Sequence, residues 1–391
     1  MMRKLFLYTV IAIMVFSCTK DDGETAKKDS FIRLYGNAYL DEGLYLRQLE
    51  DNSYLACASY SNEDEVQGGK VFKLSQNGQV LWEYASLDTL DLTIKSFFVN
   101  TDNTVVWVGH GINPATANYD IVLGKLTSGG QLEWKKYAGG AGNQYGNALC
   151  QAVDGGYIVG GSTDVDGDKD VYLHKFSVEG DSLWVRKYGT DSEDEIKDIC
   201  RSHNGGFLLT GNYGFAAGGQ TGTNLAAIEI NQFGNLVDTY TYEGVGNDEG
   251  SEVAMTDDGY IFVGTTQSAG NGETDIFVVK TSVSIRDVQW QKTYGGNAAE
   301  IGNSVFVNDD GTYTIAGSTE SYGEGNRDAY VLNLSSEGTM VIEKTFGSSG
   351  NEWVNSAIQA ADGGFGLLGA TEFTENRMIS FIKLNGNYEL E

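Results

Sequence analysis

Acidic and amide side chains recur at two fixed places along this chain of 391 residues. The first place follows an aromatic residue by six or seven positions and holds Glu42, Gln144, Glu195, Glu249, Glu300 and Glu352. The second lies three residues further on and holds Asn147, Asp198, Glu252, Asn303 and Asn355. Gathered at one place, such groups would bind a cation, a basic peptide or a hydroxyl-rich sugar. The alternative is structural: because they recur in nearly every unit, they would instead cap backbone amides and hydrate a crowded channel.

Two aromatic residues break this pattern and are the better candidates for ligand contact. Trp353 and Tyr145 occupy positions that we align with Gly43, Ile196, Gly250 and Ile301 elsewhere in the chain. Aromatic faces stack on sugars and attract cations. Residues that recur in every unit are explained by the fold, whereas residues that occur in one unit only need a different explanation. We therefore predict that Trp353 and Tyr145 contact one ligand, with Trp353 as the anchor.

One acidic loop alternates carboxylates around a glycine, as calcium loops do. Asp164, Asp166, Asp168 and Asp170 supply hard oxygen ligands, but no Glu follows at the twelfth position, so the loop is not an EF-hand. Aspartates at the place of Asp170 close the same loop in other units and are interpreted as turn formers: Asp120, Asp275 and Asp328. A solvated acidic loop is the alternative to this predicted calcium site.

A second unusual loop spans 211–219 and is rich in glycine and alanine. It contains two aromatic residues, Tyr213 and Phe215. We expect a long loop whose aromatic side chains either stack on a sugar or protein or fold inward.

The sequence contains no pattern that indicates catalytic residues. The three histidines, His110, His174 and His203, have no evident partner in the sequence. The serines lack a nucleophile elbow, and carboxylates are too numerous for any pair to indicate a glycosidase. We predict no catalytic residue and no cofactor other than the calcium ion considered above.

The elements that carry these residues come from a repeat of 50 to 53 residues. In each copy an aspartate or asparagine turn precedes an aromatic or apolar strand, as at Asp154-Gly-Gly-Tyr157. The other copies begin at Asp51, Asp102, Asn204, Asp257, Asp310 and Asp362. Self-similarity at such a period marks a repeat architecture. In the third copy we expect four strands, at 147–153, 157–161, 171–176 and 183–188, whose continuous apolar runs predict sheets covered on both faces.

The ends of the chain predict how the repeat closes. Outer strands carry a glycine and, four residues later, a tryptophan, as at Gly180 and Trp184, which predicts tryptophan packing between units. The last unit stops after its third strand, 379–384, and the segment 31–35 matches the missing fourth strand, with Phe31 in the tryptophan place. We therefore predict an all-β, seven-bladed β-propeller of four-stranded antiparallel blades, the last closed by the N-terminal strand.

These units resemble the bacterial seven-bladed β-propeller repeat family, which is common among secreted and surface proteins. The resemblance rests on Asp154-Gly-Gly-Tyr-Ile-Val-Gly-Gly and on Gly180-x-x-x-Trp184 with Tyr188-Gly, and covers residues 31–391. It implies the fold but no particular activity, because propellers host many functions. The glycine–tryptophan element is also similar to quinoprotein propellers, but this chain lacks their vicinal cysteine pair.

The N-terminus has the features of a targeting segment. Basic Arg3 and Lys4 precede a hydrophobic stretch, and Val15-Phe-Ser-Cys18 resembles the lipobox of bacterial lipoproteins. That resemblance implies a signal peptide at 1–17, a lipidated and palmitate-bearing Cys18, and a flexible tether over 18–30. Lys20-Asp21-Asp22 resembles the export signal of Bacteroidota surface lipoproteins, which implies an outer-membrane anchor facing the cell exterior. A simple secretory signal is the alternative.

Composition narrows the class of partner. A net charge of −28 argues against nucleic acid, whose phosphates require clusters of Lys and Arg. The leading hypothesis is a monomeric, non-catalytic binding or scaffold lipoprotein of the cell surface, touching the membrane only through its lipid. Its ligand would be an extracellular glycan, a peptide or another envelope protein. The alternative is a propeller enzyme, a glycoside hydrolase or lyase, that acts on polysaccharide with carboxylates at the channel mouth.

Overall fold

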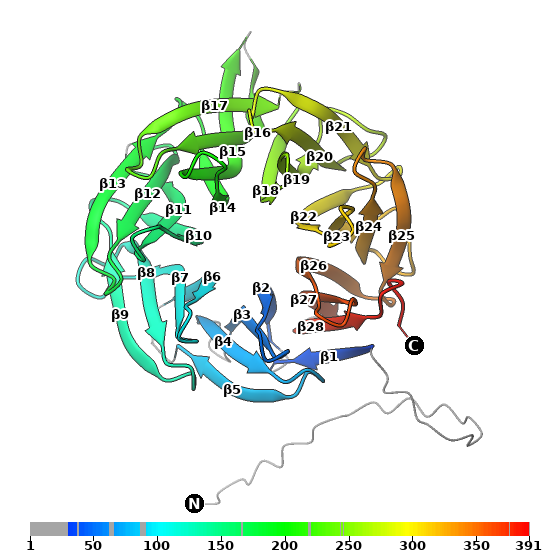
Figure 1. The fold of residues 1–391 in the computed structure, drawn as a ribbon, viewed down its shortest axis with the longest axis horizontal. Helices are drawn as coiled ribbons and strands as arrows, with labels where there is room; N and C mark the ends of the chain where they lie inside the picture. The colour runs from blue at the N-terminus through cyan, green and yellow to red at the C-terminus, as the bar shows by residue number, and fades with distance from the viewer. Residues whose placement is uncertain are drawn as a thin grey trace, which may run out of the picture.

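The computed structural model describes residues 30–36, 39–61, 66–86, 91–165, 167–217, 220–242, 244, 246–374 and 376–390. Within these ranges lie 28 strands, grouped into seven antiparallel sheets of four strands each. Figure 1 shows the sheets arranged radially around a common centre. The predicted seven-bladed β-propeller is confirmed.

Blades 1 to 6 each take four consecutive strands, from β2 to β25, and blade 7 combines β26, β27 and β28 with β1. The inner strands are β2 (Glu42–Gln48), β6 (Leu92–Val99), β10 (Gln144–Gln151), β14 (Glu195–Arg201), β18 (Asp248–Thr256), β22 (Glu300–Val307) and β26 (Asn351–Gln359). The second strands are β3 (Tyr54–Ser61), β7 (Val105–Ile112), β11 (Tyr157–Thr163), β15 (Phe207–Ala217), β19 (Gly259–Thr266), β23 (Tyr313–Thr319) and β27 (Phe365–Phe373). The third strands are β4 (Gln67–Leu74), β8 (Tyr119–Leu126), β12 (Asp170–Phe176), β16 (Gln220–Ile230), β20 (Asp275–Ser282), β24 (Asp328–Leu334) and β28 (Asn376–Leu384). The outer strands are β5 (Val80–Ala85), β9 (Leu132–Ala138), β13 (Ser182–Tyr188), β17 (Leu236–Tyr242), β21 (Val288–Tyr294), β25 (Met340–Phe346) and β1 (Phe31–Tyr35).

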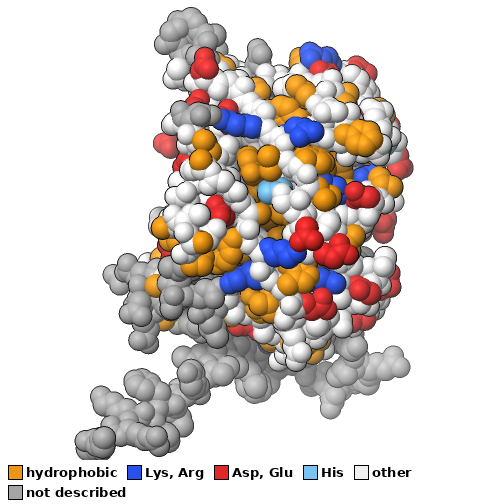
Figure 2. All heavy atoms as spheres, turned by 90° about the vertical axis from the view of Figure 1, so that its left-hand side faces the viewer, with side chains coloured by type: hydrophobic (Ala, Val, Ile, Leu, Met, Phe, Trp, Pro, Cys, Tyr) orange, Lys and Arg blue, Asp and Glu red, His pale blue; other side chains and the backbone are white. Residues whose placement is uncertain are grey.

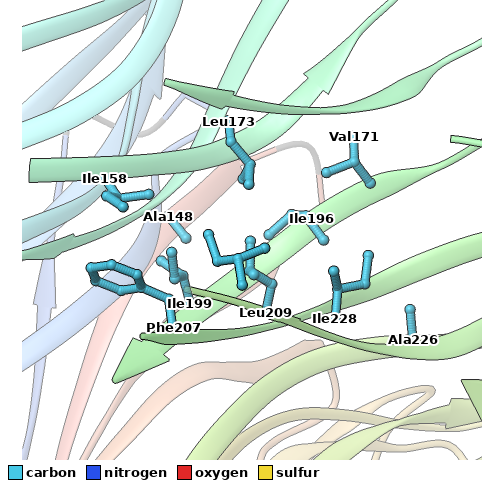
Figure 3. Packing of buried hydrophobic residues seen from close by; sticks show 11 residues of the cluster. Ala148, Ile158, Val171, Leu173, Ile196, Ile199, Phe207, Leu209, Ala226 and Ile228 are labelled. Atoms are coloured by element: carbon cyan, nitrogen blue, oxygen red, sulfur yellow. The ribbon is translucent and has the colours of Figure 1, made fainter. Parts of the chain in front are cut away.

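Hydrophobic packing is divided among the gaps between neighbouring blades. In the gap between blades 3 and 4, Ile158 and Leu173 pack with Leu209 and Ile228 (Figure 3). An equivalent cluster fills each of the other gaps. Strands β11 and β23 are buried along their whole length, because blades on either side cover both faces of the sheet. The fold thus has one core for each pair of neighbours.

Tryptophans of the outer strands pack on glycine turns of the next blade. A Cβ added to Gly180 would overlap the Trp134 ring, and one added to Gly234 would overlap the Trp184 ring. Both glycines also have positive φ, +77° and +75°, which L side chains rarely adopt. The recurrent glycine and tryptophan are therefore two halves of one contact between blades.

The N-terminal strand completes this scheme in blade 7. Strand β1 pairs with β28 from Phe31↔Lys383 to Tyr35↔Ile379. A Cβ on Gly78 would lie 2.8 Å from the Phe31 ring, so Phe31 holds the tryptophan place. The Tyr35 hydroxyl donates to the Gly78 carbonyl at 2.8 Å. The predicted closure of the ring by segment 31–35 is confirmed.

The two faces of the propeller differ in their connections. Turns between first and second strands and between third and fourth strands share one face, which we call the turn face. The remaining connections share the opposite loop face. There, β15 and β16 pair without a break out to Ala217↔Gln220, and this long hairpin projects past β17 (Figure 1). The expectation of a loop over 211–219 is therefore wrong for residues 211–217, which continue β15.

The rim of the ring is formed by outer strands with one face in solvent. Figure 2 shows the side of β9 and β13, where hydrophobic side chains lie among charged ones. Leu132, Leu183 and Val185 are the exposed apolar residues of these two strands. No helix in the described part of the chain is long and apolar enough to cross a membrane.

Candidate functional site

Every inner strand carries a β-bulge at the same place, which gives the blades a common register. In β10, Gly146 pairs with Gly161 and Ala148 with Gly160, so Asn147 is left unpaired. We name positions from this bulge. The cap position, three residues before it, holds Asp41, Leu92, Gln144, Asp194, Asp248, Glu300 and Glu352. The mouth position, one residue later, holds Glu42, Thr93, Tyr145, Glu195, Glu249, Ile301 and Trp353.

Cap residues are buried and hold the loops that lead into the inner strands. Glu300 accepts hydrogen bonds from the Gly296 amide at 2.7 Å and the Thr319 hydroxyl at 2.6 Å. Glu352 accepts from the amide and the hydroxyl of Ser348. The amide oxygen of Gln144 accepts from a backbone amide of its own loop at 2.7 Å. These contacts match the structural alternative, capping of backbone amides.

The first of the two predicted sets of acidic and amide residues does not share one register. Glu42, Glu195 and Glu249 are mouth residues, whereas Gln144, Glu300 and Glu352 are cap residues one place earlier. A shift of one residue moves a side chain to the other face of a strand. The first predicted set therefore mixes two layers. Trp353 and Tyr145 align with Glu195 and Ile301, and their predicted alignment with Gly43, Ile196 and Gly250 is wrong. Ligand binding by Glu300 and Glu352 stays a prediction, although both are buried.

Trp353 is fixed from two sides at the mouth of blade 7. Its indole Nε1 donates to the Glu42 carboxylate at 2.9 Å, which joins blade 7 to blade 1. The Arg377 guanidinium lies 4.8 Å from the centre of its rings and also pairs with Glu42 at 3.2 Å and Glu372 at 3.3 Å. The ring remains partly exposed.

A pocket of about 600 Å³ opens beside Trp353 on the loop face. Its charged side chains are Glu42, Glu320, Arg327, Glu372 and Arg377, and its amides are Asn303, Asn326, Asn351 and Asn355. Both arginines pair with acids, Arg327 with Glu320 at 2.9 Å. The pocket therefore offers an indole surface surrounded by many hydrogen-bonding groups, without a surplus of positive charge.

Asparagines at the bulge position join neighbouring blades. The Asn147 side chain donates to the Ile196 carbonyl at 2.8 Å. Asn303 donates in the same way to Val354 at 2.9 Å, and Asn355 to Gly43 at 2.9 Å. Each amide thus has a structural task, although Asn303 and Asn355 also line the pocket at Trp353.

Tyr145 lies in an aromatic cluster, separated from blade 7 by blades 1 and 2. Its ring stacks on Tyr119 at 5.7 Å and meets the edge of His110 at 5.1 Å, while Lys169 lies 5.9 Å above it. Burial and the nearby Lys95 charge lower the pKa of His110 to about 4. The sequence did not indicate His110 as a partner of Tyr145. Only the pairing of β6 with β7 brings His110 to the channel mouth, where it lies opposite the mouth residue Thr93.

Glu195 and Glu249 lie on the far side of the ring from Trp353. They line a small polar hollow of about 270 Å³ shared by blades 4 and 5. Lys169 and Lys197 each lie 3.9 Å from the Glu195 carboxylate. Neither glutamate borders the pocket at Trp353, so the predicted ligand residues fall into separate groups.

The latch position, one residue after the bulge, joins the blades deeper in the channel. It holds Tyr45, Ser96, Ala148, Asp198, Glu252, Ser304 and Ser356. The Ser304 hydroxyl accepts from the Ala357 amide of the next blade at 3.0 Å, and Ser356 accepts from Leu46 at 3.2 Å. A short hydroxyl is therefore sufficient for this contact.

Comparisons with known proteins agree on the fold alone. No protein-family model and no curated protein matches the chain. Among solved structures, the polysaccharide lyase Uly1 superposes with a TM-score of 0.51 at 9% identity, covering 90% of this chain and 91% of that one. The β-propeller domain of the Trilobed protease from Pyrococcus furiosus, described as having an open velcro topology, gives 0.50 at 9% identity, with coverages of 90% and 98%. Puromycin hydrolase gives 0.53 at 12% identity, with 87% of this chain but 51% of that one covered.

The predicted calcium loop is only partly described. Asp164 accepts hydrogen bonds from the amide and side chain of Asn143, both at 2.8 Å, and Asp170 pairs with Lys187 at 2.6 Å. Asp166 lies outside the described residues, while Asp168 lies within them. Among described residues no group of three or more His, Cys, Asp or Glu could hold a metal. Calcium binding stays a prediction.

The predicted lipidation site, Cys18, also lies outside the described residues, as do the signal peptide and most of the tether. The three cysteines of the propeller, Cys57, Cys150 and Cys200, are free. Burial raises the pKa of the Cys150 thiol to about 11, and thiols with raised pKa values are unreactive.

Proposed function

We propose that this protein is a lipid-anchored binding protein of the bacterial cell surface, and that its loop face captures an extracellular glycan. The observation that carries the proposal is the pocket of about 600 Å³ beside Trp353. It combines the partly exposed indole with amide and carboxylate groups and arginines whose charges are already paired. For the two other ligand classes predicted from the sequence, a peptide and an envelope protein, no pocket feature is as specific as this one.

The chemistry of the pocket suits a sugar. A pyranose has an apolar C–H face, which packs on an aromatic ring, and a rim of hydroxyls, which both donate and accept hydrogen bonds. Asn326 and Asn351 supply amides at the wall, and Glu320 supplies an acceptor. Fixed partners such as Glu42 hold the indole in place before a ligand arrives, which lowers the entropy cost of binding.

The direction of the anchor supports the choice of face. Strand β1 begins at Phe31, which lies against the Gly78 turn on the turn face. A lipid on Cys18, joined through the tether, would hold the turn face toward the membrane. The pocket on the loop face would then point away from the cell, where extracellular glycans are found.

A gel-retardation screen tests this function. The purified protein is run through gels that contain soluble extracellular polysaccharides of different charge and linkage. We expect retardation by at least one glycan, and Trp353→Ala should weaken it roughly tenfold or more. The variant should cost only roughly 1.5–3 kcal/mol of stability, because it loses one hydrogen bond to a charged group. Phe233→Ala is the matched control, since this aromatic is 62% exposed on the turn face.

Four outcomes would contradict the proposal. Absence of retardation by every glycan removes the function, and equal binding by Trp353→Ala removes the site. A large fall in melting temperature on that substitution would assign Trp353 to the core between blades. Cleavage of a retained glycan, seen as new reducing or unsaturated ends, would replace the binding role by the enzymatic alternative.

A further inference from the structure

A second cavity, of about 730 Å³, occupies the turn-face end of the central channel. It is lined by inner strands of blades 1, 4, 5, 6 and 7 and shares no residue with the pocket at Trp353. Four polar residues in its wall depart from the repeat: Tyr45, Arg47, Asp198 and Glu252. None of them lines the pocket at Trp353.

The two acids exceed what the fold requires of them. Asp198 and Glu252 hold the latch position in adjacent blades, where Ser304 and Ser356 suffice elsewhere. One oxygen of Asp198 accepts from the Val253 amide at 3.1 Å, and one of Glu252 accepts from Val305 at 2.9 Å. Each carboxylate therefore performs the latch with a single oxygen and brings a negative charge that the contact does not need.

An arginine faces these acids from the other side of the channel. Arg47 follows the latch residue of blade 1 by two places, where the other six inner strands carry Phe98, Cys150, Cys200, Ala254, Phe306 and Ile358. Blades 2 and 3 separate it from Asp198, and blades 6 and 7 from Glu252. Its Nε donates to the Tyr45 hydroxyl at 3.1 Å, which fixes the guanidinium. No ion pair between Arg47 and either acid occurs among the described residues, so opposite charges face one another across open space.

The raised pKa values of the pair agree with a role in binding a cation. Burial, followed by the Asp198 charge, raises the pKa of Glu252 to about 8. Burial also raises the pKa of Asp198. Arg47 lowers both pKa values but does not restore them. A proton therefore stays on this pair near neutral pH, where a ligand's ammonium group would take its place.

We propose that the cavity binds a small zwitterion of the amino-acid or dipeptide class. Its ammonium group would lie between Asp198 and Glu252 and its carboxylate against the guanidinium of Arg47, which favours planar carboxylates. The apolar part would contact Met255, Phe306 and Ile358, which complete the wall toward the turn face. Met255 is 47% exposed, so its side chain is accessible to the apolar part of a ligand.

Calorimetric titration of the purified protein tests the proposal with three probes of one shape. Leucine carries both charges, isoamylamine only the positive one and 4-methylpentanoate only the negative one. We expect leucine to bind at least about tenfold more tightly than either half. Glu252→Gln should weaken leucine and the amine but not the acid, and Arg47→Gln should weaken leucine and the acid but not the amine.

Conservative variants keep this test separate from folding. Glutamine at position 252 retains an oxygen for the Val305 amide, so the latch is preserved and thermal melts should remain cooperative. Asp257→Asn is the matched control, because this exposed carboxylate lies on the turn face of the same blade outside the cavity. Failure of all three probes to bind at millimolar concentration overturns the proposal, as does leucine binding that neither variant alters. Glycan retardation is measured on the other face, so either result stands without the other.

Discussion

Glu252 shows how one residue can serve packing and binding at once. Its carboxylate joins blade 5 to blade 6 through the Val305 amide, yet it stands beside a second acid in a confined channel. The hydrogen bond favours the charged form, and burial with a neighbouring charge opposes it. Burial and the neighbouring charge have the larger effect. The carboxyl group of Glu252 therefore stays protonated at neutral pH, where an ordinary surface carboxylate is charged.

Stability should therefore depend on pH through Glu252. The pKa is about 8 in the folded protein and near 4.5 when the chain is unfolded, as for an ordinary glutamate. Between these two pKa values the folded state binds more protons than the unfolded state, so the stability of the protein falls as pH rises. The stabilisation that comes from protonated Glu252 is lost above about pH 8. We expect Glu252→Gln to raise the melting temperature above pH 8, and its advantage to shrink toward pH 5.

Thermal melts of both proteins from pH 5 to 9 measure this difference, in which the titrations of groups outside the Asp198–Glu252 pair cancel. Asp257→Asn should follow the parent protein at every pH, because this carboxylate is exposed. A Glu252→Gln curve parallel to the parent would show that the glutamate ionises normally.

The sequence predicted the exact positions of the site residues less well than it predicted the fold. Exceptions such as Trp353 were visible because they break a repeat, but the cap and mouth layers were merged. Tyr188 to Asp194 and Tyr294 to Glu300 both span six residues, so strict spacing would have separated Asp194 from Glu195. The pockets themselves depend on pairs such as Trp353 with Arg377, which come together only when the ring closes.

At the scale of elements, β1 differs from every other strand because it reaches its blade from the opposite end of the chain. It joins β28 through Phe31 to Tyr35, and Phe31 packs edge-on against Phe381 at 5.5 Å. Closure was predictable because Phe31-Ile-Arg-Leu-Tyr35 repeats an outer-strand pattern. The long β15–β16 hairpin was not, since glycine and alanine give no alternation and its pairing is visible only across strands.

Deleting residues 31–35 should destabilise the propeller strongly. Loss of Phe31 burial alone costs roughly 1.5–3 kcal/mol, and the backbone edge of β28 would be left unpaired, which favours aggregation. Differential scanning calorimetry and light scattering measure the two effects. Deleting residues 19–28, which precede the strand, should leave the melting temperature unchanged. Equal melting of both truncations would refute the stabilising role of β1.

The whole molecule combines a strongly acidic surface with a core divided among seven gaps. Its net charge is −28, and like charges on a compact body repel one another. The clusters between blades must hold the ring together against this repulsion. The fold was predictable at this scale because the repeat period, the strand signatures and the closure segment all agree.

Salt should therefore stabilise the protein. Raising sodium chloride from about 10 to 150 mM shortens the screening length from roughly 30 to 8 Å, so we expect a higher melting temperature. Choline chloride at equal ionic strength should give the same rise, because screening does not depend on the cation. A further rise with calcium chloride at equal ionic strength would indicate bound calcium, and its loss in Asp164→Asn would place that ion in the predicted loop. Insensitivity to salt would show that surface repulsion is negligible.

The position of Phe31 at the turn-face end of β1 also determines how the ring resists mechanical force. Figure 1 shows β1 running along the rim of the ring, so a pull on the preceding chain directed along the rim acts along the axis of β1. All the backbone pairs between β1 and β28, from Phe31↔Lys383 to Tyr35↔Ile379, then carry the force together in shear. A strand pulled across its axis would instead lose its pairs one after another, as a zipper opens. The strand that closes the ring is thus oriented to withstand tension directed along the rim.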